Sequence, residues 1–287
     1  MSFSSDVRNE ILQFWQKKNC CKTTEIYGIL LFGHKFSDNE IKIKTDNEEL
    51  ASHCRSIIKK VFDIVCDITE SKGVYTVSID KLHISDVKSK LGESNAINLS
   101  LLKCDNCFNA FLRGAFLSCG VISDPEKEYH LEFVVKNEGL AWELCKMIRT
   151  KGLDAKIIER RGKFVVYLKD SENIEDLLTM MNATNASLFI MNQKIIKQLR
   201  NNVNRITNFE TANLQKSAQS AAKHIEAIEK LDKAGLLSTL PDELYKAAIA
   251  RRDNFDLSLS ELGKTLGLSR AGIYHRLDKI VKLASKI

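Results

Sequence analysis

The 287-residue sequence has only two prolines, Pro125 and Pro241, and no apolar run near the roughly 20 residues that a membrane-spanning helix needs. Few prolines leave few forced breaks, so the chain should be rich in regular structure. The polar start, MSFSSDVRNE, lacks the apolar segment of a signal peptide. Since 44% of the residues are hydrophobic and 28% charged, we expect a soluble cytoplasmic protein with a sizeable core and no contact with a membrane.

An excess of positive charge is missing from most of the chain. Residues 1–191 contain 26 Lys and Arg against 27 Asp and Glu, residues 192–240 contain 8 against 4, and residues 241–287 contain 9 against 6. A basic C-terminal end suits the neutralisation of nucleic-acid phosphates. An excess this small also occurs on solvated helices, so charge alone favours DNA as a partner without requiring it.

Disulfides are not expected, because reduced thiols are the rule without export. Cys104 and Cys107 have the two-residue gap of a zinc half-site, and Cys20 with Cys21 is the most plausible other half. Adjacent cysteines make poor ligand geometry, so we expect core or surface thiols, no metal site and no cofactor. All eight cysteines lie in the first 145 residues: Cys20, Cys21, Cys54, Cys66, Cys104, Cys107, Cys119 and Cys145.

Residues 256–280, DLSLSELGKTLGLSRAGIYHRLDKI, predict two helices joined by a tight turn. Ser258 and Glu261 have the spacing of a capping box, Gly267 ends the first helix, and Ser269 is the N-cap of the second. This combination predicts a helix-turn-helix, and the alternative is a plain helical hairpin. Apolar residues recur at helical spacing on the buried face of the second helix: Ile273, Leu277, Ile280 and Val281.

Polar residues at the start of such a second helix reach base edges in the major groove, where Arg suits guanine and hydroxyls suit bases or phosphates. A separate basic, amide-rich run predicts either a solvated connector or a segment that contacts the DNA backbone or caps helix ends, and the sequence favours neither. That run comprises Arg200, Asn201, Asn202, Asn204 and Arg205. The predicted DNA-binding residues of the helix-turn-helix are Ser258, Gly267, Ser269, Arg270, Ala271, Gly272, Tyr274, His275, Arg276 and Lys279.

The first 191 residues predict an internal repeat. The order helix, strand, helix, hairpin, helix occurs twice, and Gly28 and Gly114 lie about 86 residues apart in corresponding apolar helices. Glycine lets helix axes approach to the short end of the usual range of about 8–10 Å, so we expect these helices to pack on each other. After the repeat, the pattern predicts helices at residues 191–199 and 211–233, separated by a polar stretch.

Several runs of residues are similar to the WhiA family of bacterial regulators, and the doubled apolar helices resemble the LAGLIDADG repeats of homing endonucleases. These runs are Met1–Ser5, Cys20-Cys21, RGAFL at 113–117 with Gly120, SDPEK at 123–127 before YHLE at 129–132, and RNNVNR at 200–205 before ETAN at 210–213.

The resemblance implies an α+β fold in three parts. A LAGLIDADG-like domain at residues 1–191, with repeats at about 1–92 and 93–191, is joined by a basic helical linker at 192–240 to an all-α helix-turn-helix domain at 241–287. It also implies a nucleoid-associated DNA-binding regulator of transcription, involved in the cell cycle, cell division and chromosome segregation, and in sporulation in sporulating relatives. Double-stranded DNA, and a regulatory or division protein, are the implied partners.

The chain differs from the endonucleases at the residues that bind the catalytic metal ions. Their motif carries a metal-binding acid at its next-to-last place, where this sequence has Gly33 and Cys119. Neither suits Mg²⁺, which prefers oxygen ligands, so we expect no catalytic residues and no nuclease activity. Two alternatives stay open: a residual metal-dependent nuclease, and an interaction protein that recruits a partner through the LAGLIDADG-like domain.

The basic residues of the predicted sheets would make that domain a DNA surface only if they cluster on one face. These residues are Lys42, Lys44, Arg160, Arg161 and Lys163.

Overall fold

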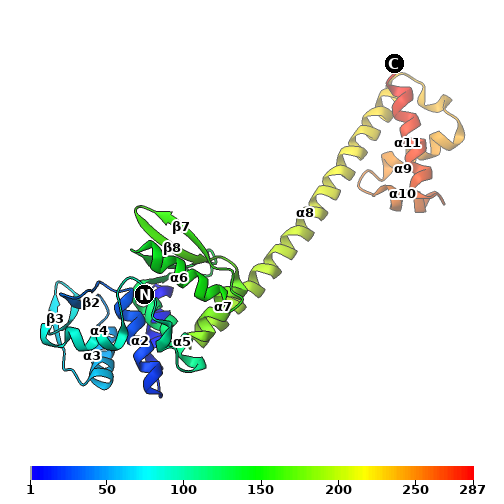
Figure 1. Cartoon of the computed structure of the whole chain (residues 1–287). Helices are drawn as coiled ribbons and strands as arrows, with labels where there is room; N and C mark the ends of the chain where they lie inside the picture. Colours follow the sequence, from blue (N-terminus) through cyan, green and yellow to red (C-terminus); the bar gives the residue numbers. More distant parts are fainter. Residues whose placement is uncertain (1) are drawn as a thin grey trace. The chain divides into compact units, whose positions relative to one another are not determined.

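Helices and strands alternate through the first two thirds of the chain, and only helices follow (Figure 1). The computed structural model describes residues 2–287, so Met1 of the Met1–Ser5 run lies outside the described residues. The chain groups into two compact units, which meet between Lys197 and Gln198. The three-part division at residues 191 and 240 stays a prediction.

The first unit contains two copies of one arrangement. Its two four-stranded antiparallel sheets have the equivalent strand orders β1-β2-β4-β3 and β5-β6-β8-β7, so the internal repeat is confirmed. The first copy comprises α1 (Phe3–Gln13), α2 (Asn19–Leu31), β1 (Lys35–Phe36), β2 (Ile41–Thr45), α3 (Glu48–Phe62), β3 (Asp67–Ser71), β4 (Val74–Ile79) and α4 (Ile84–Leu91). The second comprises α5 (Asp105–Cys119), β5 (Gly120–Ile122), β6 (Leu131–Val135), α6 (Glu138–Arg149), β7 (Lys156–Arg160), β8 (Lys163–Leu168) and α7 (Ser171–Met180).

Local sequence explains the matching helices α3 and α6. Asn47 and Asn137 are their N-caps, and each side-chain oxygen accepts a hydrogen bond of 3.0 Å from the backbone amide three residues later. Asparagine is favoured here because it satisfies an amide that has no partner within the helix. The edge strands β1 and β5 escaped prediction, since two or three residues are too few to show an alternating pattern.

Helices α2 and α5 pack backbone against backbone at the centre of the first unit. A Cβ added to Gly28 would lie 2.5 Å from the carbonyl oxygen of Phe111, and one added to Gly114 would lie 2.1 Å from that of Glu25. Only glycine fits at either position, because real Cβ atoms do not approach backbone atoms this closely. The predicted glycine-mediated helix pair is therefore confirmed.

A buried ionic network ties this helix pair to its neighbours. Oε1 of Glu25 lies 2.7 Å from Nε2 of His53, and Oε2 lies 3.4 Å from Nε of Arg113. Nη2 of Arg113 donates to the carbonyl oxygens of Ile11, at 2.9 Å, and Phe14, at 2.8 Å, at the end of α1. Arg113 is fully buried, so it supports the packing of α1 and is not available to DNA.

Four of the cysteines lie together where α2 and α5 begin, which the expectation of core or surface thiols did not include. The sulfur atoms of Cys20, Cys21, Cys104 and Cys107 all lie within 4.8 Å of one another. All eight cysteines of the chain are free thiols. The sequence analysis expected poor ligand geometry from the adjacent Cys20 and Cys21, but the sulfur atoms of both lie within 4 Å of a sulfur of the second pair.

The sequence analysis predicted that the basic run Arg200–Arg205 separates two helices, and this prediction is wrong. It lies inside α8 (Thr184–Lys233), a continuous helix of 50 residues, and all six of its residues are exposed. Asparagine is a weak helix former but does not break a helix, and neither proline nor glycine occurs between residues 184 and 233. The polar side chains of this run therefore indicate an exposed stretch of helix, and not a loop.

The second unit packs the end of α8 against three short helices, α9 (Asp242–Asp253), α10 (Leu259–Thr265) and α11 (Arg270–Ala284). No helix within residues 2–287 is long and apolar enough to cross a membrane. The core of this unit includes Ile228 and Leu231 of α8, Ala247 and Ala248 of α9, Leu262 of α10, and Ile273, Leu277, Ile280 and Ala284 of α11.

Candidate nucleic-acid interface

Helix α10 begins with the predicted capping box. The Glu261 amide donates to the hydroxyl oxygen of Ser258 at 3.3 Å, and the Ser258 amide donates to the carboxylate of Glu261 at 2.9 Å. These hydrogen bonds hold the pKa of Glu261 below its usual value. Two amides that the helix leaves unpaired are thus satisfied, which fixes where α10 starts.

The turn between α10 and α11 depends on Gly267, which adopts a φ of +68°. The Gly267 amide donates to the carbonyl of Lys264 at 3.2 Å, and the Leu268 amide donates to that of Gly263 at 2.8 Å. This pair of bonds is the Schellman ending of a helix, which favours glycine at the left-handed position. Sequence spacing had marked Gly267 correctly.

A buried arginine supports the loop before α10. The side chain of Arg251, at 1% exposure, donates to the carbonyl oxygen of Leu257 at 2.7 Å and, at 3.4 Å each, to those of Asn254 and Phe255. Burial lowers the pKa of this guanidinium, although nearby Asp256 opposes the shift. The sequence analysis did not predict a role for Arg251, because the residues around it in the sequence do not distinguish it from Arg252, which is exposed.

Helix α11 is anchored by one face and exposed on the other. Its N-cap Ser269 accepts a hydrogen bond of 3.1 Å from the Gly272 amide. The apolar residues at helical spacing are buried, with Val281 only partly so. Of the predicted DNA-binding residues, Ser258, Gly272 and Arg276 are half-buried, and those that are exposed are Gly267, Ser269, Arg270, Ala271, Tyr274, His275 and Lys279.

Arg276 differs from the other predicted contacts because it already has a protein partner. Its Nη2 atom lies 3.2 Å from Oε2 of Glu243 on α9, and its side chain is 26% exposed. Any contact of Arg276 with DNA would have to compete with this ion pair. Arg270 has the freer guanidinium at the start of α11, since its side chain is exposed and forms no ion pair within residues 2–287.

A groove lies between α8 and the helix-turn-helix within the second unit. Its walls include Arg270 and Tyr274 from α11 and the loop residue Ser258. From α8 come Asn213, the last residue of the ETAN run, and Lys216 one turn further on. The run Arg200–Arg205 does not line this groove, so of the two family-like runs only ETAN contributes a residue, Asn213, to a groove that α11 also lines.

A nuclease centre of the endonuclease kind would lie at the C-terminal ends of α2 and α5. Gly33 follows α2, and Cys119 is the last residue of α5. Burial raises the pKa of the Cys119 thiol to about 12. Next to Gly33, burial and then the charges of Lys44 and Lys136 lower the pKa of His34. Lysines therefore lie near this end of the helix pair, and neither Gly33 nor Cys119 supplies the acid that the endonuclease motif has at that place.

The basic residues of the two sheets are partly neutralised. Nζ of Lys42 lies 2.5 Å from a carboxylate oxygen of Glu40, and Nη2 of Arg160 lies 2.7 Å from Oε1 of Glu132. Although burial alone would raise the pKa of Glu132, hydrogen bonds from His130 and Arg160 hold it below its usual value. Arg161 and Lys163 line a shallow hollow on the β7–β8 hairpin with Arg160, Val134 and Val165.

Two protein-family models match parts of this chain. Residues 108–200 match the family described as the WhiA LAGLIDADG-like domain, and residues 203–284 match the WhiA C-terminal HTH domain. Two similar relatives are both named "Probable cell division protein WhiA". The one from Clostridium novyi is 36% identical over all of this chain and 98% of its own length, and the one from Caldicellulosiruptor saccharolyticus is 38% identical over all of this chain and 96% of its own length.

The fold agrees with these relatives. The crystal structure of full-length DUF199/WhiA from Thermotoga maritima is similar with a TM-score of 0.63 and 26% identity, over all of this chain and 99% of that one. The structure of the N-terminal LAGLIDADG domain of DUF199/WhiA matches with a TM-score of 0.50 and 19% identity, covering 63% of this chain and 90% of that one.

Fold and site thus define a class: a helix-turn-helix protein that also carries a LAGLIDADG-like domain without that motif's acids. Within that class, the chain belongs to the WhiA family, in which both of these relatives carry the name "Probable cell division protein WhiA".

Proposed function

We propose that this protein is a non-enzymatic, sequence-specific DNA-binding regulator that acts on the nucleoid in the cytoplasm and serves cell division and chromosome segregation. The observation that carries the proposal is the geometry of α11. Its apolar face is buried, while Arg270, Tyr274, His275 and Lys279 are exposed. Helices that read DNA place such side chains on base edges in the major groove.

Charge and helix polarity support this orientation. The backbone amides at the start of α11 and the positive end of the helix dipole favour a phosphate beside Ser269. Lys216 of α8, in the groove next to Arg270, adds a cation from outside the helix-turn-helix. The division role rests on the names of the relatives.

The proposal of no nuclease activity rests on the ends of α2 and α5. A metal-dependent nuclease needs carboxylates that hold the ions activating water, whereas Gly33 and Cys119 stand at those places and lysines surround His34. Duplex DNA incubated with the full chain and Mg²⁺ should remain unnicked.

The first experiment isolates genomic fragments that the full chain retains, then measures their affinity by fluorescence anisotropy across a salt series. Arg270→Ala should weaken specific binding by about 5- to 150-fold, equivalent to about 1–3 kcal/mol for one base contact. The slope of log affinity against log salt should be about −0.9 per phosphate contact in the parent protein.

Lys246→Ala is the matched control. Lys246 is also an exposed cation of the second unit, but its Nζ lies 2.7 Å from Asp242 on the same helix, α9. It should leave affinity within about twofold. If Arg270→Ala and Lys246→Ala bind equally well, α11 does not read DNA, and the sheets of the first unit become the candidate surface.

A further inference from the structure

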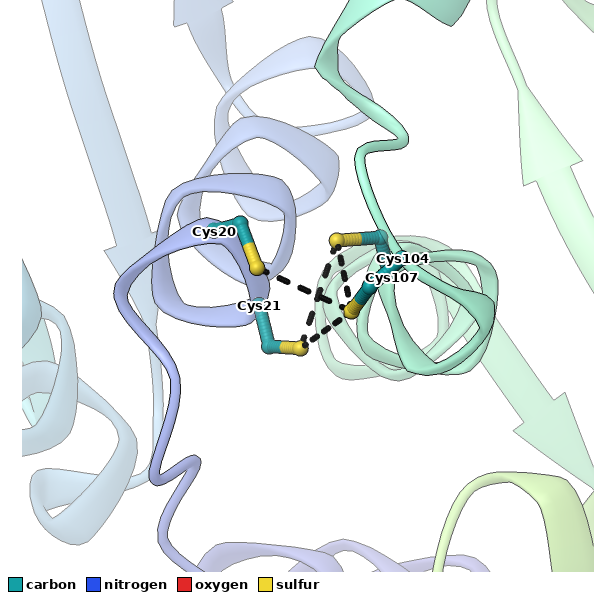
Figure 2. Close-up of side chains that lie close together, drawn as sticks. All are labelled: Cys20, Cys21, Cys104 and Cys107. Atoms are coloured by element: carbon teal, nitrogen blue, oxygen red, sulfur yellow. Dashed lines mark hydrogen bonds between the residues drawn. The ribbon is translucent and has the colours of Figure 1, made fainter.

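The cysteine cluster lies outside the nucleic-acid interface and has the geometry of a metal site (Figure 2). Sγ of Cys104 lies 3.5 Å from that of Cys107, 3.6 Å from that of Cys21 and 3.7 Å from that of Cys20. The sulfurs of Cys21 and Cys107 are 4.0 Å apart. Zinc–sulfur bonds of about 2.3 Å in a tetrahedron place sulfur atoms about 3.8 Å apart, so these thiols already have the required spacing.

The positions of the cysteines in two helices explain the cluster. Cys20 and Cys21 are the second and third residues of α2, and Cys104 is the N-cap of α5 with Cys107 in its first turn. Neighbouring residues of a helix point about 100° apart, which lets Cys20 and Cys21 approach the second pair from two directions. Two parallel helices thus each bring one pair of sulfurs to a common point.

We propose that Cys20, Cys21, Cys104 and Cys107 bind one Zn²⁺ ion in a structural, four-thiolate site. Four protein ligands leave no position for water or substrate, which is the arrangement of structural and not catalytic zinc. Sulfur ligands in a tetrahedron select zinc over magnesium, calcium or manganese, which take oxygen ligands.

The surroundings of the cluster suit four thiolates around a divalent ion. Cys21 and Cys107 are buried, while Cys20 and Cys104 are partly exposed, which gives an ion a path from solvent. Each pair of ligands lies at a helix N-terminus, where amides and the helix dipole stabilise negative charge. Lys103 and Asp105 flank Cys104 in the chain and line one pocket with it.

The site would cross-link the two repeats. Cys20 and Cys21 belong to the first copy, and Cys104 and Cys107 to the second, and Cys104 lies 83 positions after Cys21 in the chain. The endonuclease-like positions, Gly33 and Cys119, lie at the other ends of the same two helices. From Cys21 to Gly33 the helical rise is about 18 Å, so the proposed ion is separate from any nuclease centre and serves the packing of α2 on α5.

The test measures metal in the full chain, expressed without a polyhistidine tag in zinc-supplemented medium and purified with reductant. Elemental analysis should give about one zinc per chain in the parent and less than about 0.1 in the Cys104→Ser/Cys107→Ser variant. Cys119→Ser, a control that removes a thiol of the same helix outside the cluster, should keep the zinc. Cobalt added to the metal-free parent should produce the thiolate charge-transfer and tetrahedral absorption bands.

A second measurement covers the case in which the double variant misfolds. Zinc added to the metal-free parent at about 100 times its Kd should raise Tm by about 5–10 °C, and the same addition should leave Cys20→Ser unchanged or nearly so. The proposal is overturned if the parent contains neither zinc nor a cobalt-binding site. Iron with sulfide in place of zinc, or a disulfide within the cluster with no bound zinc, would overturn it as well.

Discussion

The two units use paired helices in opposite ways. In the first unit, nine of the 13 residues of α2 and ten of the 15 residues of α5 are buried. In the second unit, only four of the 15 residues of α11 are buried. Charge follows the same division, since residues 1–197 have 28 Lys and Arg against 27 Asp and Glu, and residues 198–287 have 15 against 10.

The difference in burial shows which parts of the LAGLIDADG arrangement this chain has. Its helix pair persists as a packing axis, with glycines at the contact and a buried Glu25–Arg113 pair beside it, while the acids at its functional end are absent. In the second unit, Gly267 serves a turn, and one face of α11 is exposed. The comparison predicts that equivalent substitutions have different consequences in the two units.

The largest effect is expected for Gly114→Ala in the first unit. The added methyl group would meet the carbonyl oxygen of Glu25 at 2.1 Å and the amide nitrogen of Ile29 at 2.9 Å, so α2 and α5 would have to separate. The free energy of unfolding should fall by about 3 kcal/mol or more. Urea denaturation followed by tryptophan fluorescence measures it, because Trp15 and Trp142 both belong to the first unit.

Gly139→Ala is the control for this prediction. Gly139 is exposed in the first turn of α6, where an added Cβ would meet only the side-chain oxygen of Asn137, at 3.3 Å. Its stability should stay within about 1 kcal/mol of the parent. Equal stability of Gly114→Ala and Gly139→Ala would contradict the close helix contact.

An intermediate effect is expected from acid on the second unit. Burial, and then the charge of Arg251, lower the pKa of His224 to about 4, although Asp278 opposes the shift. An unfolded histidine titrates at about 6.5. Between these values the unfolded state binds more protons, so the free energy of unfolding should fall by about 2–3 kcal/mol as pH decreases from about 6.5 to 4.

Hydrogen exchange of α11 peptides, corrected for the intrinsic pH dependence, measures this loss. His224→Leu should remove most of the histidine contribution, whereas His275→Gln should keep it because His275 is exposed. A similar slope in the parent and in His224→Leu would assign the acid sensitivity to other groups.

The smallest effect is expected for Gly267→Ala. Nothing lies within 4 Å of the added Cβ, so the cost is only that of holding alanine at a φ of +68°, about 1 kcal/mol. Gly272→Ala is the opposite case, since Gly272 is helical and its added Cβ makes ordinary contacts at 3.5 Å and beyond. It should stabilise α11 by about 0.5–1 kcal/mol. Hydrogen exchange of α10 and α11 should therefore move in opposite directions in the two variants.

Elements with strong local signals were predictable from sequence. The capping box of Ser258 and Glu261, the turn at Gly267 and the N-cap at Ser269 depend on residues close in the chain, and all occur where predicted. The bounds of α5, Asp105–Cys119, also agree with the sequence. Local signals failed where polarity was mistaken for a break, as at Arg200–Arg205 in α8.

The repeat, the helix-turn-helix and the lack of acids at positions 33 and 119 could be predicted from the sequence, because each depends on residue type and spacing along the chain. Tertiary structure decided which distant side chains meet. It paired Arg276 with Glu243, buried Arg251 beneath the loop before α10, and brought Cys20 and Cys21 to Cys104 and Cys107. Those contacts depend on how closely α2 approaches α5 and how α9 packs on α11. The spacing of residue types along the chain does not predict either packing arrangement.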